Sequence, residues 1–180
     1  MFVPLPKIKE TIMKKILFSA VLAVVMSLTA EAQEAEGKNK VYNEDIDPIE
    51  QIEQAVMKAR SEKKFVICQV GGNWCHWCLR FADYITNDTT ISNMIDKNFV
   101  YIHVNYLPRR SEGIQAERAK KVQQRLNYPA RFGFPVFVVL DEEGKVIHLQ
   151  DSGYLEEGQG YNREKVLSFF KNWTPKAVKG

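Results

Sequence analysis

The chain has 180 residues, of which 45% are hydrophobic and 26% are charged, and its formal net charge is +3. This length allows one domain with a real core, and the composition excludes a disordered chain. Beyond residue 32 the chain holds 21 basic and 20 acidic residues, a balance of +1. It therefore lacks the basic field that attracts nucleic acid or an acidic membrane.

The N-terminus has the three parts of a secretory signal. The pair Lys14-Lys15 precedes an uncharged apolar run over 16–28, and the small-x-small pattern Ala-Glu-Ala follows at 30–32. We expect a signal peptide over 1–32, cleaved after its last alanine, and an exported protein that is periplasmic or secreted. The apolar run is short for a membrane span, so we expect none after cleavage, with an uncleaved anchor as the alternative. Met13 is a possible true start.

The chain after the signal opens on a polar stretch. Residues 33–45 are expected to form a flexible linker, which leaves 46–180 for the folded domain. A helix is expected to begin at Asp47, because Asp47 can cap it and Pro48 suits its first position. A buried strand is expected over 65–70, where β-branched residues precede two glycines.

Hydrophobic spacing and turn residues predict the elements that follow. In chain order these are a helix that starts at Cys75 and continues through Ile85, a short helix from Asp88 or Thr89 to Ile95, a strand over 99–104, a surface helix over 111–126, a strand over 135–140, a turn over 141–144, a strand over 145–149 and a helix over 162–173.

The candidate reactive site is the segment Trp74-Cys75-His76-Trp77-Cys78. A Cys-x-x-Cys pair alone is a weak signal, since zinc sites use the same spacing. Here a strand feeds a short loop and the pair opens a helix, where backbone N–H groups and the helix dipole favour a thiolate. Cys75 is therefore expected to be the nucleophile and Cys78, one turn on, the resolving thiol. A structural disulfide and a zinc site remain the alternatives.

The residues around the pair allow further expectations. Trp74 and Trp77 are expected to form an apolar surface around the active sulfur, with a packing role as the alternative, and of the two Trp74 is the one favoured to be half buried. His76 either assists the Cys75 thiolate as a cation or proton donor, or is an exposed residue without a partner. Cys68, in mid-strand, is expected to be buried and inert, with a third redox thiol as the alternative. Too few further ligands are evident for zinc, so we expect neither metal nor cofactor.

Residues 46–173 resemble the thioredoxin superfamily, and most closely its exported members with a Trp-Cys-x-x-Cys motif. Besides the dithiol, 98–105 is similar to the second central strand of the family. Residues 132–136 resemble its cis-proline segment, and 141–145 its hairpin turn. The resemblance implies an α/β thioredoxin fold, a central mixed β-sheet flanked by helices.

The resemblance also implies roles for residues far from the dithiol. Pro135 would be cis and would lie beside the two cysteines, and Phe134 would present its backbone to a substrate peptide. Two departures leave the redox direction open. Gln69 stands where the family often has a buried Asp that assists proton transfer, and His76-Trp77 replaces the common Gly-Pro between the cysteines.

These expectations combine into an extracytoplasmic thiol–disulfide oxidoreductase. It would exchange disulfides with protein substrates through Cys75 and Cys78, and a redox partner would reset the dithiol. The alternative function is a thioredoxin-fold binding or chaperone-like module without net redox turnover.

Overall fold

A computed structural model describes residues 40–107 and 112–180. The predicted signal peptide lies outside the described residues. The packed domain spans Val41–Gly180. It therefore begins five residues earlier than the sequence indicated, because Tyr42 is completely buried in it. Within the described ranges, no helix has both the length and the hydropathy that a membrane crossing requires.

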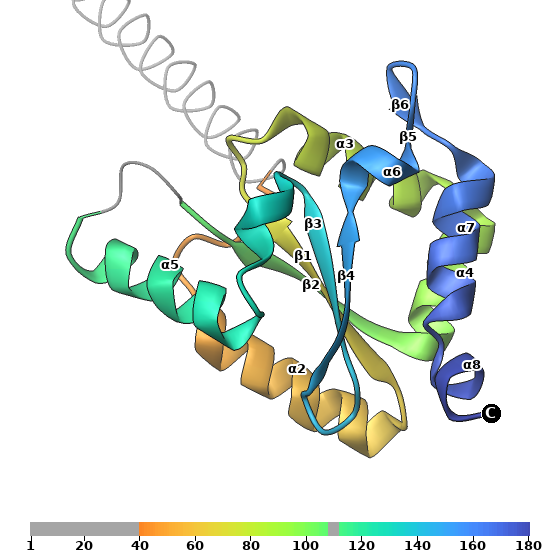
Figure 1. Cartoon of the computed structure of the whole chain (residues 1–180), viewed down its shortest axis with the longest axis horizontal. Coiled ribbons are helices and arrows are strands. Elements are labelled where there is room, and N and C mark those ends of the chain that lie inside the picture. The colour runs from red at the N-terminus through yellow and green to blue at the C-terminus, as the bar shows by residue number, and fades with distance from the viewer. Residues whose placement is uncertain (1–39, 108–111) are drawn as a thin grey trace, which may run out of the picture. The chain divides into compact units, whose positions relative to one another are not determined.

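The centre of the domain is a four-stranded sheet (Figure 1). Its order is β2-β1-β3-β4, with β1 parallel to β2 and antiparallel to β3, and β3 antiparallel to β4. This confirms the predicted mixed sheet. The bounds of the strands are β1 (Phe65–Gly71), β2 (Phe99–Asn105), β3 (Val136–Leu140) and β4 (Val146–Asp151).

Helices cover both faces of the sheet (Figure 1). Because side chains alternate along a strand, β1 contributes Val66 and Val70 to one core and Phe65 and Ile67 to the other. The first core lies under α2 (Pro48–Glu62) and α5 (Ile114–Arg125). The second lies under α3 (His76–Asn87), α4 (Thr89–Asn98) and α7 (Arg163–Asn172). This is the predicted α/β arrangement.

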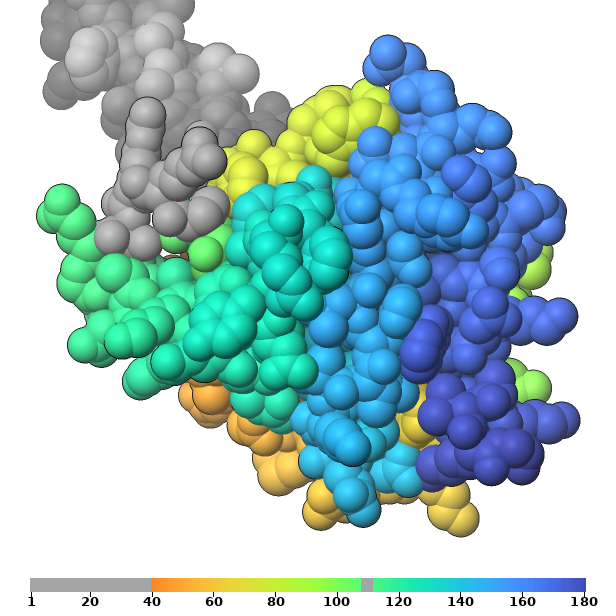
Figure 2. Space-filling model, in the orientation of Figure 1, coloured from red at the N-terminus to blue at the C-terminus, as the bar shows by residue number. Residues whose placement is uncertain are grey.

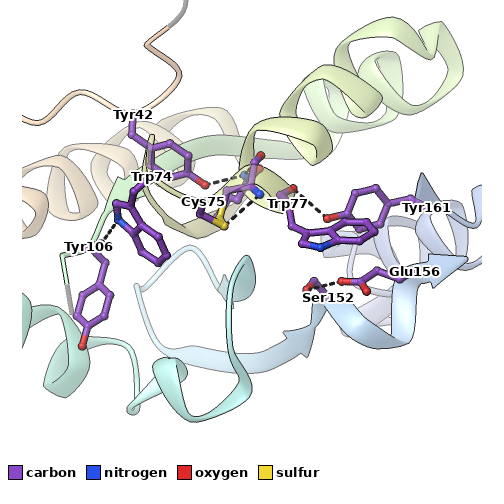
Figure 3. The surroundings of a disulfide bond; sticks show 10 residues. Tyr42, Trp74, Cys75, Trp77, Tyr106, Ser152, Glu156 and Tyr161 are labelled. Atoms are coloured by element: carbon purple, nitrogen blue, oxygen red, sulfur yellow. Dashed lines mark hydrogen bonds between the residues drawn. A yellow bond between two sulfur atoms is a disulfide. The ribbon is translucent and has the colours of Figure 1, made fainter. Parts of the chain in front are cut away.

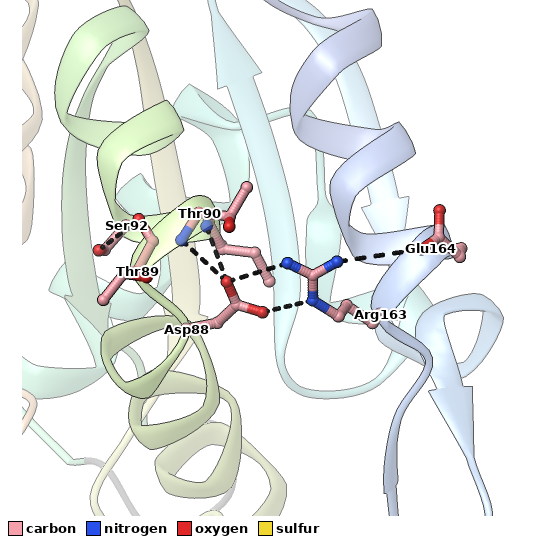
Figure 4. A network of polar contacts seen from close by, with 7 residues as sticks. Asp88, Thr89, Thr90, Ser92, Arg163 and Glu164 are labelled. Carbon is pink, nitrogen blue, oxygen red and sulfur yellow. Dashed lines mark hydrogen bonds and ion pairs between the residues drawn. The ribbon is translucent and has the colours of Figure 1, made fainter.

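Asp88 holds the start of α4 and connects it to α7. One carboxylate oxygen accepts the N–H groups of Thr90 and Ile91 at 2.9 and 3.2 Å, which caps the helix. The other oxygen lies 2.6 Å from Nε of Arg163, the first residue of α7 (Figure 4). The cap was predicted from the sequence, whereas the ion pair joins residues 75 positions apart.

The elements that the sequence did not predict are short. They are η1 (Pro129–Phe132), α6 (Ser152–Leu155), β5 (Glu156–Glu157), β6 (Gly160–Tyr161) and α8 (Pro175–Lys179). Two to five residues are too few to show a hydrophobic period. The surface helix starts at Ile114 instead of 111, after Gly113 with φ of 58°. The strand predicted over 145–149 is β4, and it extends to Asp151 because that residue pairs with Val136.

Candidate active site

The central strand β1 leads directly into the dithiol. The chain leaves the strand at Gly71, and the N–H of Cys75 bonds to the carbonyl of Gly72 at 3.0 Å. Cys75 is the N-cap of α3, as the sequence predicted, and the N–H of Cys78 donates to Sγ of Cys75 at 3.2 Å. The sulfur of Cys75 therefore accepts a hydrogen bond from a backbone amide at the positive end of a helix.

Cys75 and Cys78 are joined in a disulfide, with their Cα atoms 5.2 Å apart. The side chain of Cys78 is wholly inaccessible, whereas Cys75 keeps 7% of its surface exposed. The more accessible sulfur is therefore the one at the helix start. Among the described residues, no group of three or more His, Cys, Asp or Glu side chains could hold a metal ion.

The two tryptophans flank Cys75 on opposite sides (Figure 3). Trp74 is 49% exposed and so is half buried, as the sequence favoured, but Trp77 is the more buried of the two. Its indole N–H reaches outward to the carbonyl of Tyr106 at 3.0 Å, which holds the ring at the surface. Trp77 is part-buried, because its ring packs edge-on against Tyr161 and its carbonyl accepts the Tyr161 hydroxyl at 3.0 Å.

The peptide bond between Phe134 and Pro135 is cis, as the resemblance implied. The Phe134 ring meets Trp74 edge-on at 5.3 Å and stacks on Tyr106 at 5.4 Å. Phe134 also packs against the cluster that contains the disulfide. On the face shown in Figure 2, η1 and the loop into β3 adjoin the surface that carries the start of α3. The tertiary structure thus brings Phe134, the residue before the cis-proline, to the cluster that contains the dithiol.

His76 has a partner, so the expectation that it lacks one is wrong. Its Nε2 lies 2.8 Å from the Arg80 guanidinium. A guanidinium offers only donors, so in this contact the His76 nitrogen is the acceptor. Arg80 also lies over the Trp77 ring, 4.8 Å from its centroid. Arg80, four residues after His76 on α3, therefore contacts both side chains that lie between the two cysteines.

Cys68 is a free, fully buried thiol. Burial raises its pKa to about 12, so it carries no thiolate at neutral pH. This agrees with the inert role that the sequence indicated.

Sequence reasoning missed Tyr42. The residue lies in the predicted linker, yet it packs against both cysteines (Figure 3). Asn73 fixes its backbone, accepting its N–H at 3.1 Å and donating to its carbonyl at 2.8 Å. One signal was present, a single aromatic residue among polar neighbours, but nothing local indicated what it contacts.

A helix-opening Cys-x-x-Cys disulfide on a mixed sheet, beside a cis-proline, defines the class of thioredoxin-fold thiol–disulfide oxidoreductases. Comparison with known families is consistent with this class. The model of the Thioredox_DsbH family, described as a protein of unknown function (DUF255), matches residues 33–174. The chain belongs to this thioredoxin-like DsbH family.

Individual relatives carry names from the same class. The disulfide bond reductase DsbH of Chlamydia pneumoniae is 25% identical over 112 residues, which cover 62% of this chain and 65% of that protein. The match thus spans slightly less than two thirds of the relative. The crystal structure of a disulphide isomerase from Xylella fastidiosa Temecula1 shares the fold, with a TM-score of 0.60 and 23% identity over 73% of this chain and 94% of that one. A structure of a DsbH oxidoreductase has a TM-score of 0.49 and 20% identity, over 71% and 81% of the two chains.

Proposed function

We propose that this protein is an exported oxidoreductase that reduces disulfides in protein substrates. The observation that carries the proposal is the Cys75–Cys78 disulfide at the first turn of α3, with Cys75 at the cap and the more accessible of the two. A redox-active pair needs a nucleophile that a substrate can reach and a second sulfur held within bonding distance.

The reaction follows from that geometry. In the reduced protein, the Cys75 thiolate attacks a substrate disulfide and forms a mixed disulfide, while the other substrate sulfur leaves as a thiolate and takes a proton. Cys78 then loses its proton and bonds to Cys75, which releases the second substrate sulfur. The substrate disulfide gains two electrons and becomes two thiols, and the Cys75–Cys78 pair is oxidised. A dithiol partner returns it to the reduced state.

The aromatic side chains beside the disulfide supply the docking surface for the substrate. Trp74 is exposed next to Cys75, and Phe134 packs edge-on against it. Pro135, which follows Phe134, has no N–H, so the Phe134 carbonyl and the backbone before it are the polar groups that a peptide can bond there. An extended segment around the substrate cysteine fits this surface.

The name of one relative supports reduction as the direction. The relative from Chlamydia pneumoniae is named a disulfide bond reductase. We expect a reduction potential near −270 mV, as in thioredoxin, and a value near −120 mV would reverse the direction.

Turnover distinguishes this function from the binding-module alternative. The protein should accelerate insulin reduction by dithiothreitol, and Cys75→Ser should abolish the effect. Cys68→Ser is the matched control, because Cys68 is buried away from the exchange chemistry, and it should retain activity. A folded wild-type protein that binds unfolded clients but accelerates no reduction would establish the alternative.

Export is supported by the sequence over 1–32. N-terminal sequencing of the protein from an expressing bacterium should find Gln33 first, in the periplasmic or secreted fraction. A start at Met1 or Met13 would contradict cleavage after Ala32.

A further inference from the structure

The buried amide of Gln69 organises a polar network beneath the disulfide. Its Nε2 donates to the Tyr42 hydroxyl at 2.7 Å and to the carbonyl of Cys78 at 2.9 Å. Its Oε1 accepts the Tyr101 hydroxyl at 2.6 Å. The carbonyl of Cys78 can only accept, so the amide must turn its NH₂ group toward it, which fixes the orientation of Gln69.

This orientation determines what Tyr42 can do. Gln69 donates one N–H to the Cys78 carbonyl and the other to the Tyr42 hydroxyl. The hydroxyl is therefore the acceptor in that bond. The hydroxyl proton of Tyr42 is then directed away from Gln69.

The Tyr42 hydroxyl and the sulfur of Cys78 both lie beside Gly71. A Cβ atom built on Gly71 would lie 2.4 Å from Sγ of Cys78 and 2.9 Å from the Tyr42 hydroxyl oxygen. The Cys78 sulfur and the Tyr42 hydroxyl oxygen thus border the same small space beside Gly71, and any side chain at position 71 would fill that space. Figure 3 shows the Tyr42 ring directed toward the disulfide from the side of the N-terminal segment. Tyr42 has no exposed surface, so water does not compete for its proton.

We propose that Tyr42 donates a hydrogen bond to the sulfur of Cys78 in the reduced protein and stabilises the thiolate that this sulfur must become in the resolving step. The proposal rests on the proposed function and adds a residue to its site. The Cys78 proton passes to the substrate sulfur that leaves Cys75, and Tyr42 stays protonated throughout. Gln69, which has no acidic proton, serves by holding the Tyr42 hydroxyl in place.

The charge state of the surroundings favours a donor and not a base. Burial raises the pKa of Tyr42 well above its usual value, so the hydroxyl keeps its proton. On β2, burial raises the pKa of Tyr101 and lowers that of His103 to about 4. Burial also raises the pKa of Tyr161 beside α3. These neighbours stay neutral between pH 5 and 10, a range set by the ordinary tyrosine value of about 10. A thiolate signal observed in that range therefore does not come from these neighbours.

The test measures the pKa of Cys78 directly. In protein carrying Cys68→Ala and Cys75→Ser, Cys78 is the remaining thiol, and its thiolate absorbs in the ultraviolet near 240 nm. Adding Tyr42→Phe keeps the ring and removes the donor, which should raise the Cys78 pKa by about one unit. Tyr101→Phe is the matched control, because it also removes a hydroxyl from Gln69 but leaves the Tyr42 hydroxyl. It should leave that pKa unchanged.

A second measurement uses the intact dithiol, in case the triple variant does not fold. In single-turnover reduction of a disulfide peptide at pH 7, Tyr42→Phe should slow release of the mixed disulfide about tenfold and leave its formation by Cys75 unchanged. An unaltered Cys78 pKa, an equal shift in Tyr101→Phe, or an unaltered release rate would overturn the role of Tyr42. If instead the wild type reduces no disulfide while the pKa shift is present, the proposed function fails and the hydrogen bond stands.

Discussion

Cys75 and Cys78 are three residues apart but have different surroundings. Cys75 caps α3, receives the amide of Cys78 and is partly accessible, whereas Cys78 is sealed beneath it. We therefore expect Cys78→Ser to accumulate mixed disulfides with substrates, because the attacking sulfur survives and the resolving one is lost. Cys75→Ser should trap few or none. Non-reducing gels followed by mass spectrometry make the comparison, and more complexes with Cys75→Ser would reverse the two roles.

Gly71 is a second residue whose identity the site determines. A methyl group there would overlap Sγ of Cys78 at 2.4 Å, so Gly71→Ala must displace the sulfur or the strand. We expect a loss of about 1–3 kcal/mol in the free energy of unfolding, as for other overpacked cores, together with slower disulfide closure. Gly160→Ala is the control, since nothing lies within 4 Å of its added carbon. Equal stability of the two variants in urea denaturation would contradict this prediction.

At the scale of the elements, the contact between Asp88 and Arg163 joins the starts of α4 and α7 (Figure 4). The hydrogen bond from Arg163, followed by the amides of the α4 cap, lowers the pKa of Asp88. Because the folded pKa lies below the unfolded one, the stabilisation is complete above the unfolded value and is lost as the pH falls through the folded one.

The substitution Asp88→Asn keeps a good helix cap and removes only the charge. We expect it to lower the Tm at pH 7 by a few degrees or less, because exposed ion pairs contribute little. The difference from the wild type should shrink as the pH falls below the usual carboxyl range. Circular dichroism at both pH values measures it, with the exposed Asp96→Asn on the same helix as a control. A difference that grows in acid would contradict the assignment.

At the scale of the whole molecule, the segment before α2 belongs to the folded domain. Tyr42 is completely buried, and Asn73 and Gln69 bond to its backbone and hydroxyl. A chain beginning at Val41 should therefore be as stable as the full mature protein. A chain beginning at Asp47 should lose about 3 kcal/mol or more, the typical cost of emptying a large aromatic site. Urea denaturation compares the two, and equal midpoints would show that the segment is dispensable.

Local patterns in the sequence were sufficient for the long elements and for the dithiol. A buried strand rich in β-branched residues, two glycines and a helical period after Cys75 placed this cysteine at a helix start, because each of these signals acts within a few residues. The resemblance to thioredoxins added Pro135, and the cis bond confirms that part of it. The contact that holds the Trp74 indole was not predictable in this way, since the carbonyl of Tyr106 that accepts its N–H lies 32 residues along the chain.

The sequence by itself therefore determined the chain order of the main elements and the sulfur pair at the start of α3. Only the tertiary structure decided what surrounds that pair. Gln69 bonds to Tyr42, 27 residues away in the sequence, and to Tyr101, 32 residues away. The hydrophobic periodicity of the sequence does not predict contacts over such separations. Burial also changes the chemistry of two residues, because it raises the pKa of Tyr42 and that of Cys68, and so keeps the Tyr42 hydroxyl protonated over a wider pH range and makes Cys68 an inert thiol.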